Sequence, residues 1–184
     1  MTPLFTLPDA WSGGSIDALM FFGPASLDRA IAVGEALWSV ECLDGPYRDR
    51  HTETSRQSRC GYTGFTEDGC EQLVGVLTHP DGSRTPFIHT TVRDGDGLWI
   101  YIGPPVGGLP ARWDIGAYPF DDGKPTLWLT QLIATLHGVC EHVHARCTSK
   151  GAIVGWDTLA DPEELLAAIN GRIAAERWAP ITIW

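Results

Sequence analysis

The stretch Leu73–Gly103, LVGVLTHPDGSRTPFIHTTVRDGDGLWIYIG, decides the fold. Two turn sequences divide it: HPDG at residues 79–82, where proline presets φ and glycine supplies the left-handed position, and DGDG at residues 94–97. The three remaining runs are apolar, aromatic or β-branched, which is typical of half-buried strands: Leu73–Leu77, Phe87–Val92 and Leu98–Ile102. The stretch therefore predicts an antiparallel meander.

The segments before and after this meander contain apolar residues at helical spacing. Ser26 is a good N-cap for a helix that reaches Trp38, and a third helix should begin at the Asp161-Pro162 pair. Between them lies a longer helix, Thr126–Arg146, whose core face would hold Leu129, Leu132, Ile133, Leu136, Cys140 and Val143. Short apolar runs predict further strands at Ile16–Phe22, Ala152–Trp156 and Pro180–Trp184.

A chain of 184 residues with this order of elements fits one α+β domain, residues 1–184. We expect an antiparallel sheet with the meander at its centre and three helices packed mainly on one face. A long polar loop is expected at about residues 44–71, where four arginines are interleaved with acidic residues and glycines. Because so long a structureless connection is unusual in a compact domain, a short strand could lie at Tyr62–Phe65.

The charge distribution bears on the class of partner. The chain has 23 acidic and 13 basic residues, a formal charge of −10, and each half carries −5. An even acidic balance disfavours direct binding to a phosphate backbone and favours encounter with a basic partner, although it is also an ordinary route to solubility. The five cysteines show no metal-ribbon spacing, so free thiols are expected.

Targeting signals are also missing from the sequence as written. The first nine residues, MTPLFTLPD, hold neither a basic region nor a long apolar run, and no segment approaches the length of a membrane span. We therefore expect a cytoplasmic protein without a membrane segment.

One helix could hold a metal ion. At about 100° per residue, His137, Glu141 and His144 fall on one flank of the 126–146 helix, whereas Cys140 and Cys147 fall inside its apolar stripe. Two imidazoles and a carboxylate would make a partial zinc site, to be completed by a ligand from elsewhere, and His79 or His89 on the first hairpin could supply it. The alternative is a solvated helix shoulder, in which Gly138 loosens the same turn.

Sequences of known catalytic sites are missing: there is no G-x-S-x-G, no P-loop, no H-E-x-x-H and no strand-linked G-x-G-x-x-G. The chain is therefore more readily interpreted as a binding protein than as an enzyme. A mixture of rigid rings and carboxylates suits a surface for a basic partner, unless the rings are part of the core. The candidate partner-binding residues are Trp113, Asp114, Tyr118, Phe120, Asp121 and Asp122.

The sequence leaves two main hypotheses about function. The first is a small acidic cytoplasmic protein that neutralises or regulates a basic protein, as an immunity protein neutralises a toxin, by occluding its functional surface. The alternative is a metal-dependent enzyme or small-ligand-binding protein that uses His137, Glu141 and His144, with zinc as the metal. As a structural subunit, the chain could pair the strand at Ile181–Trp184 with that of a second copy to form a homodimer.

Overall fold

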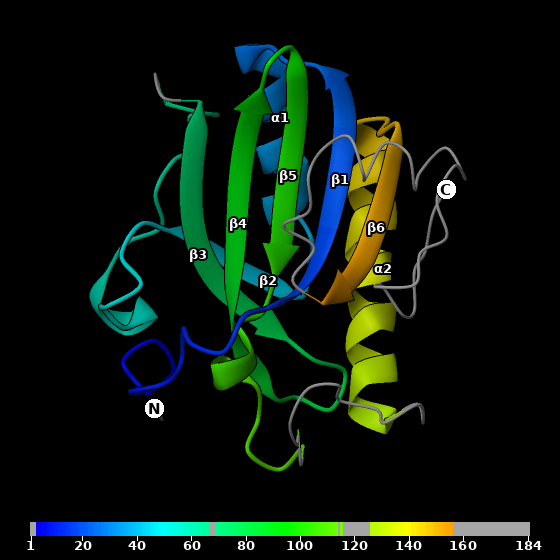
Figure 1. Ribbon diagram of the computed structural model, residues 1–184. Coiled ribbons are helices and arrows are strands. Elements are labelled where there is room, and N and C mark those ends of the chain that lie inside the picture. Colours follow the sequence, from blue (N-terminus) through cyan, green and yellow to red (C-terminus); the bar gives the residue numbers. More distant parts are fainter. Residues whose placement is uncertain (1–2, 67–68, 114, 116–125, 157–184) are drawn as a thin grey trace.

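The computed structural model describes residues 3–66, 69–113, 115 and 126–156 (Figure 1). These residues form a six-stranded antiparallel sheet in the order β2-β3-β4-β5-β1-β6. The elements are β1 (Ile16–Pro24), α1 (Leu27–Trp38), β2 (Leu43–Tyr47), β3 (Cys70–Thr78), β4 (Arg84–Asp94), β5 (Gly97–Gly103), α2 (Leu127–Arg146) and β6 (Gly151–Trp156), with short 3-10 helices at Thr54–Arg56 and Val106–Gly108. The α+β class predicted from the sequence is confirmed.

The meander β3-β4-β5 forms as the turn sequences predict. Gly82 and Gly95 have φ of +77° and +54°, the left-handed conformation that glycine adopts without strain. In the first turn the Gly82 amide donates to the His79 carbonyl at 2.9 Å. Both pairings are in register over their full length, with Val74 opposite Ile88 and Thr91 opposite Ile100.

Both described helices lie on the same face of the sheet (Figure 1). Ser26 caps α1 by accepting a hydrogen bond from the Arg29 amide at 3.2 Å, as its side chain predicts. The six core positions expected for α2 are all buried, and Cys140 is among them. They pack with alternate residues of the sheet, such as Met20 and Ile100, into one large core.

The described residues contain two α-helices, whereas the sequence predicts three. The helix expected from Asp161 and the strand expected at Pro180–Trp184 lie outside the described residues. All five cysteines are described, and they form no disulfide with one another.

The opposite face of the sheet is partly covered by the N-terminal segment. Phe5 packs edge-on against Trp11 and Tyr47, with ring centroids 5.0 and 6.3 Å apart, and covers Val74 and Val76 of β3. The same segment fixes the loop after β5, because the amides of Val106 and Gly107 donate to carbonyls of residues 14 and 12 at 3.0 and 2.9 Å. This loop leads directly to Trp113.

The polar segment 44–71 differs from its prediction. A strand does form, but at Leu43–Tyr47 rather than at Tyr62–Phe65, where no strand is assigned. Most residues between β2 and β3 are exposed, as expected of a polar loop, and two of its arginines pair with acidic residues of β2 and β3. Glu71 is 95% buried and accepts hydrogen bonds from Thr63 at 3.0 Å and from Arg48 at 3.4 Å. Arg59 likewise pairs with Asp44 at 2.8 Å, so these two arginines are paired within the segment.

Candidate binding pocket

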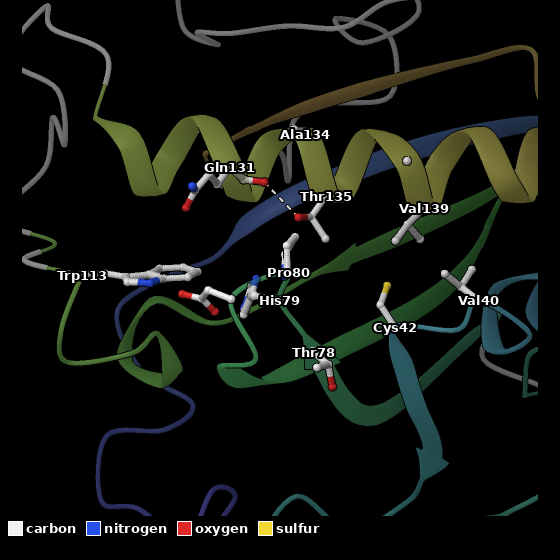
Figure 2. A pocket seen from close by; sticks show the side chains of 12 residues that line it. Val40, Cys42, Thr78, His79, Pro80, Trp113, Gln131, Ala134, Thr135 and Val139 are labelled. Carbon is white, nitrogen blue, oxygen red and sulfur yellow. Dashed lines mark hydrogen bonds between the residues drawn. The ribbon is translucent and has the colours of Figure 1, made fainter.

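A pocket of about 500 Å³ lies between α2 and the β3–β4 turn (Figure 2). One wall is the flank of α2, and the facing wall is the turn together with the chain that enters β2. Trp113 closes one end and Val40 lies at the other (Figure 2). The lining is mostly apolar: Val40, Cys42, Thr78, His79, Pro80, Asp81, Trp113, Gln131, Ala134, Thr135, Gly138 and Val139.

The β3–β4 turn places His79 at the pocket. The side chain of His79 is 4% exposed, and its Nε2 shares a hydrogen bond with the Thr85 hydroxyl at 3.0 Å. The other ring nitrogen, Nδ1, makes no hydrogen bond with a described residue. Burial lowers the pKa of His79 to about 4, an effect that the nearby Asp81 carboxylate only partly offsets, so the ring is neutral at pH 7.

Asp81, the next polar residue of the turn, is already fully engaged. Its Oδ1 accepts hydrogen bonds from the Ser83 amide at 2.8 Å and the Ser83 hydroxyl at 2.5 Å, and its Oδ2 accepts one from Arg112 at 2.6 Å. The hydrogen bonds from Ser83, with a smaller contribution from the Arg112 charge, lower the pKa of Asp81 to about 2. This carboxylate is therefore ionised and paired at the rim of the pocket.

Trp113 is one of the candidate partner-binding residues, for which the sequence left a place in the core as the alternative, and it is 8% exposed. Its ring stacks on Trp128 of α2, with centroids 6.2 Å apart and planes 20° from parallel, and meets the His79 ring edge-on at 4.7 Å. These contacts, one from α2 and one from the β3–β4 turn, hold the indole in one orientation. Trp113 is thus a rigid end wall of the pocket.

The other candidate partner-binding residues lie outside the described part of the chain: Asp114, Tyr118, Phe120, Asp121 and Asp122. Their assignment to a partner surface stays a prediction from the sequence.

A second histidine, His89 of β4, lies in a closed polar cluster between α1 and the sheet. The Trp38 indole donates to His89 Nδ1 at 3.1 Å, so the proton of the neutral ring is on Nε2, which donates to the Thr91 hydroxyl at 2.9 Å. Tyr62 stacks on the ring at 5.2 Å and its hydroxyl bonds to Thr91. Burial lowers the pKa of His89 to about 3. Both ring nitrogens are therefore used within the fold.

The α2 flank brings together two of the three proposed metal ligands. His137 Nδ1 lies 3.6 Å from Glu141 Oε2, whereas His144 Nδ1 accepts a hydrogen bond from the Ser149 amide at 3.2 Å and contacts the Ser149 hydroxyl at 2.8 Å. His79 and His89 are held in the contacts described above. Among the described residues, no group of three or more His, Cys, Asp or Glu side chains is placed to hold a metal ion.

Comparisons with protein-family models, with curated proteins and with solved structures found no match to this chain. In the part of the chain that the structure describes, no helix is both long enough and apolar enough to cross a membrane. The assignment of a function therefore depends on the geometry of the pocket and on the chemistry of the sequence.

Sequence reasoning missed most of the pocket. It interpreted residues 79–82 as a turn and His79 only as a possible completing ligand of a zinc site, and it treated Gly138 only as a weak point in a helix. Gly138 was nevertheless a usable signal, because a glycine within a strongly periodic helix calls for a reason in packing or function. The facing residues Val40 and Cys42 offered no such signal.

Proposed function

We propose that this chain is a small acidic binding protein that neutralises or regulates a basic protein partner, in the manner of an immunity protein or inhibitor, by occluding the partner's functional surface. The observation that carries the proposal is the fixed position of Trp113. This residue immediately precedes the aromatic and acidic stretch 114–122, and contacts with Trp128 and His79 hold it in place. A rigidly held aromatic side chain next to the binding residues reduces the entropy that is lost when a complex forms.

The net charge supports the same proposal. A charge of −10 spread over the chain attracts a basic protein over a long range and speeds the encounter. Asp114, Asp121 and Asp122 would then contact the partner's basic groove, while Tyr118 and Phe120 supply apolar contacts. This division of roles needs no catalytic group on this chain.

The test is affinity capture from the native host at low salt and then at raised salt, with mass spectrometry of the bound proteins. We expect one stoichiometric basic partner that is released as salt rises, since exposed charges are screened. The double variant Asp121→Lys with Asp122→Lys should lose this partner. A matched control, Asp94→Lys with Asp96→Lys, makes the same change of charge in the β4–β5 turn and should retain it.

Two outcomes would contradict the proposal. In the first, no basic protein is retained at low salt. In the second, the two double variants weaken capture equally, which would mean that only the overall charge matters and that the 114–122 stretch is not the contact surface.

A further inference from the structure

The pocket between α2 and the β3–β4 turn is larger than the packing of the fold requires. Its volume of about 500 Å³ falls within the range of about 300–1,000 Å³ that is usual for small-molecule sites. Its walls come from α2, the β3–β4 turn, the chain that enters β2 and the loop that carries Trp113, and backbone hydrogen bonds hold the last three. The cavity is therefore preformed, which is the usual condition of a ligand site.

Gly138 marks the wall of this pocket. Glycine in a helix costs about 1 kcal/mol relative to alanine, so it normally has a local cause. Gly34 of α1 has such a cause, because a Cβ there would collide with the Tyr62 ring. At Gly138 a Cβ would have no atom within 4 Å. Gly138 is exposed and lines the pocket, so the space beside it is open to solvent and to a ligand and is filled by no described part of the chain.

The charges around the pocket define what can enter it. Among the described residues that line it, Asp81 alone carries a charge, and that charge is paired with Arg112 at 2.6 Å. His79 is neutral and keeps one ring nitrogen without a described partner. The buried lining residues are His79, Trp113 and Val139, and a charged group placed against them would lose part of its water without gaining a counter-ion. The lining thus favours an uncharged molecule.

We propose that this pocket binds an uncharged small molecule with a flat, largely apolar body and a single hydrogen-bonding group. The body lies between Trp113 and the open wall at Gly138, and the hydrogen-bonding group meets the unoccupied side of the His79 ring. The site shares Trp113 with the partner-binding function proposed above, but binding of a small molecule here does not require that function.

Three probes that share one ring system test the proposal: 3-ethylindole, which is neutral, tryptamine, which is cationic, and indole-3-acetate, which is anionic. Isothermal titration calorimetry at pH 7 should show saturable binding of 3-ethylindole. The two charged probes should bind at least about tenfold more weakly, because the pocket offers no partner for their charge. The proposal is overturned if 3-ethylindole does not bind the folded protein, or if all three probes bind equally.

Two matched variants locate the binding. Gly138→Leu fills the open wall and should weaken 3-ethylindole binding at least about tenfold, since the side chain occupies the ligand's space. Ala145→Leu adds a leucine on an exposed position about two turns further along α2, outside the pocket, and should leave binding unchanged. Thermal unfolding of both variants shows that each is folded. Equal affinity in Gly138→Leu and in the parent protein would overturn the proposal.

A competition experiment separates a small molecule from a protein side chain as the natural occupant. If a basic partner has been captured, it is added to the complex with 3-ethylindole. We expect both to bind at once. Displacement of the probe by the partner, together with loss of the partner in Gly138→Leu, would assign the pocket to a side chain of the partner and overturn the small-molecule assignment.

Discussion

His79 and His89 lie on the same hairpin, and burial holds both rings neutral, yet their surroundings are opposite. The His89 ring uses both nitrogens, at Trp38 and Thr91, and is stacked against Tyr62. The His79 ring uses one nitrogen, at Thr85, and borders a cavity. The difference teaches that burial alone does not identify a functional histidine. A buried histidine whose two ring nitrogens both bond within the fold is structural. A buried histidine with one nitrogen left over is available to a ligand.

The largest expected effect comes from removing the indole that closes the His89 cluster. Trp38 fills the space over Gly45 and Gly75 and meets Phe87 edge-on at 5.9 Å. Trp38→Ala should therefore lower the free energy of unfolding by about 3–5 kcal/mol, and it also leaves His89 Nδ1 without a donor. Urea denaturation followed by circular dichroism gives the value.

The same truncation at the pocket provides the comparison. Trp113→Ala should cost less, about 2 kcal/mol, because the truncation leaves no buried ring nitrogen without a donor, unlike the loss of Trp38 beside His89. A cost for Trp113→Ala equal to that for Trp38→Ala would mean that the pocket wall is as tightly packed as the closed cluster.

The second effect is on the pH dependence of stability. Above about pH 6.5 both rings are neutral in the folded and unfolded states, so the full stability is present. Below that value the unfolded chain takes up protons that the folded chain does not, because folding lowers the pKa of His79 to about 4 and that of His89 to about 3. Each ring should reduce the free energy of unfolding by about 1.4 kcal/mol per pH unit until its folded pKa is reached.

Two variants show how much of this slope comes from each histidine. His79→Gln should flatten the pH dependence between pH 6.5 and 4 and leave the slope between pH 4 and 3 as in the parent protein, whereas His89→Gln should flatten both intervals. Denaturation midpoints measured at half-unit steps of pH give the slopes. Parallel curves for the parent protein and both variants would show that neither ring is held neutral by folding.

The third effect compares the glycines of the two regions. Gly34→Ala places a methyl group in the Tyr62 ring and should lower the free energy of unfolding by about 1–3 kcal/mol. Gly138→Ala meets no neighbour and should raise it by about 1 kcal/mol through helix propensity alone. The midpoint of thermal denaturation should therefore fall for Gly34→Ala and rise for Gly138→Ala. A loss of stability in Gly138→Ala would mean that the pocket wall is occupied by a part of the chain.

The smallest effect concerns the carboxylate at the pocket rim. Arg112→Ala should change stability by less than about 1 kcal/mol, because the pair with Asp81 is exposed on both sides. The pKa of Asp81 should stay below its ordinary value, since hydrogen bonds from Ser83 are the larger cause of the shift. Carbon-13 NMR titration of the Asp81 carboxyl measures it. Ser83→Ala should raise this pKa more than Arg112→Ala does, and the reverse order would contradict the assignment.

Much of the fold could be predicted because its signals are local. Turn residues at 79–82 and 94–97 define the meander, and the apolar period of 126–146 predicts the buried face of α2. The edge strand β2 escaped prediction, because its sequence LDGPY contains glycine and proline. An edge strand tolerates proline, since one side of its backbone needs no partner in the sheet. That β2 lies at the edge is known only from the strand order of the folded sheet.

The pocket could not be predicted, because its walls come from segments far apart in the chain. For Trp113 the sequence left both a partner surface and the core open, and its burial depends on a contact with Trp128 of α2. His79 and Gly138 are brought to one cavity because α2, which packs on β1, β6 and α1, extends past the β3–β4 turn. Such convergence depends on strand order and helix placement, which local periodicity does not encode.

The position of β1 in the sheet has a consequence for how the chain folds. Phe21 pairs with Trp99 on one side and with Gly151 on the other, so the first strand is completed by the fifth and the sixth. Two long loops must close before the sheet is continuous, and contacts between such distant residues slow folding. During synthesis, β1 cannot complete its pairing until residues 151–156 have left the ribosome. We expect the nascent chain to expose an apolar strand for most of its synthesis and to depend on chaperones at that stage.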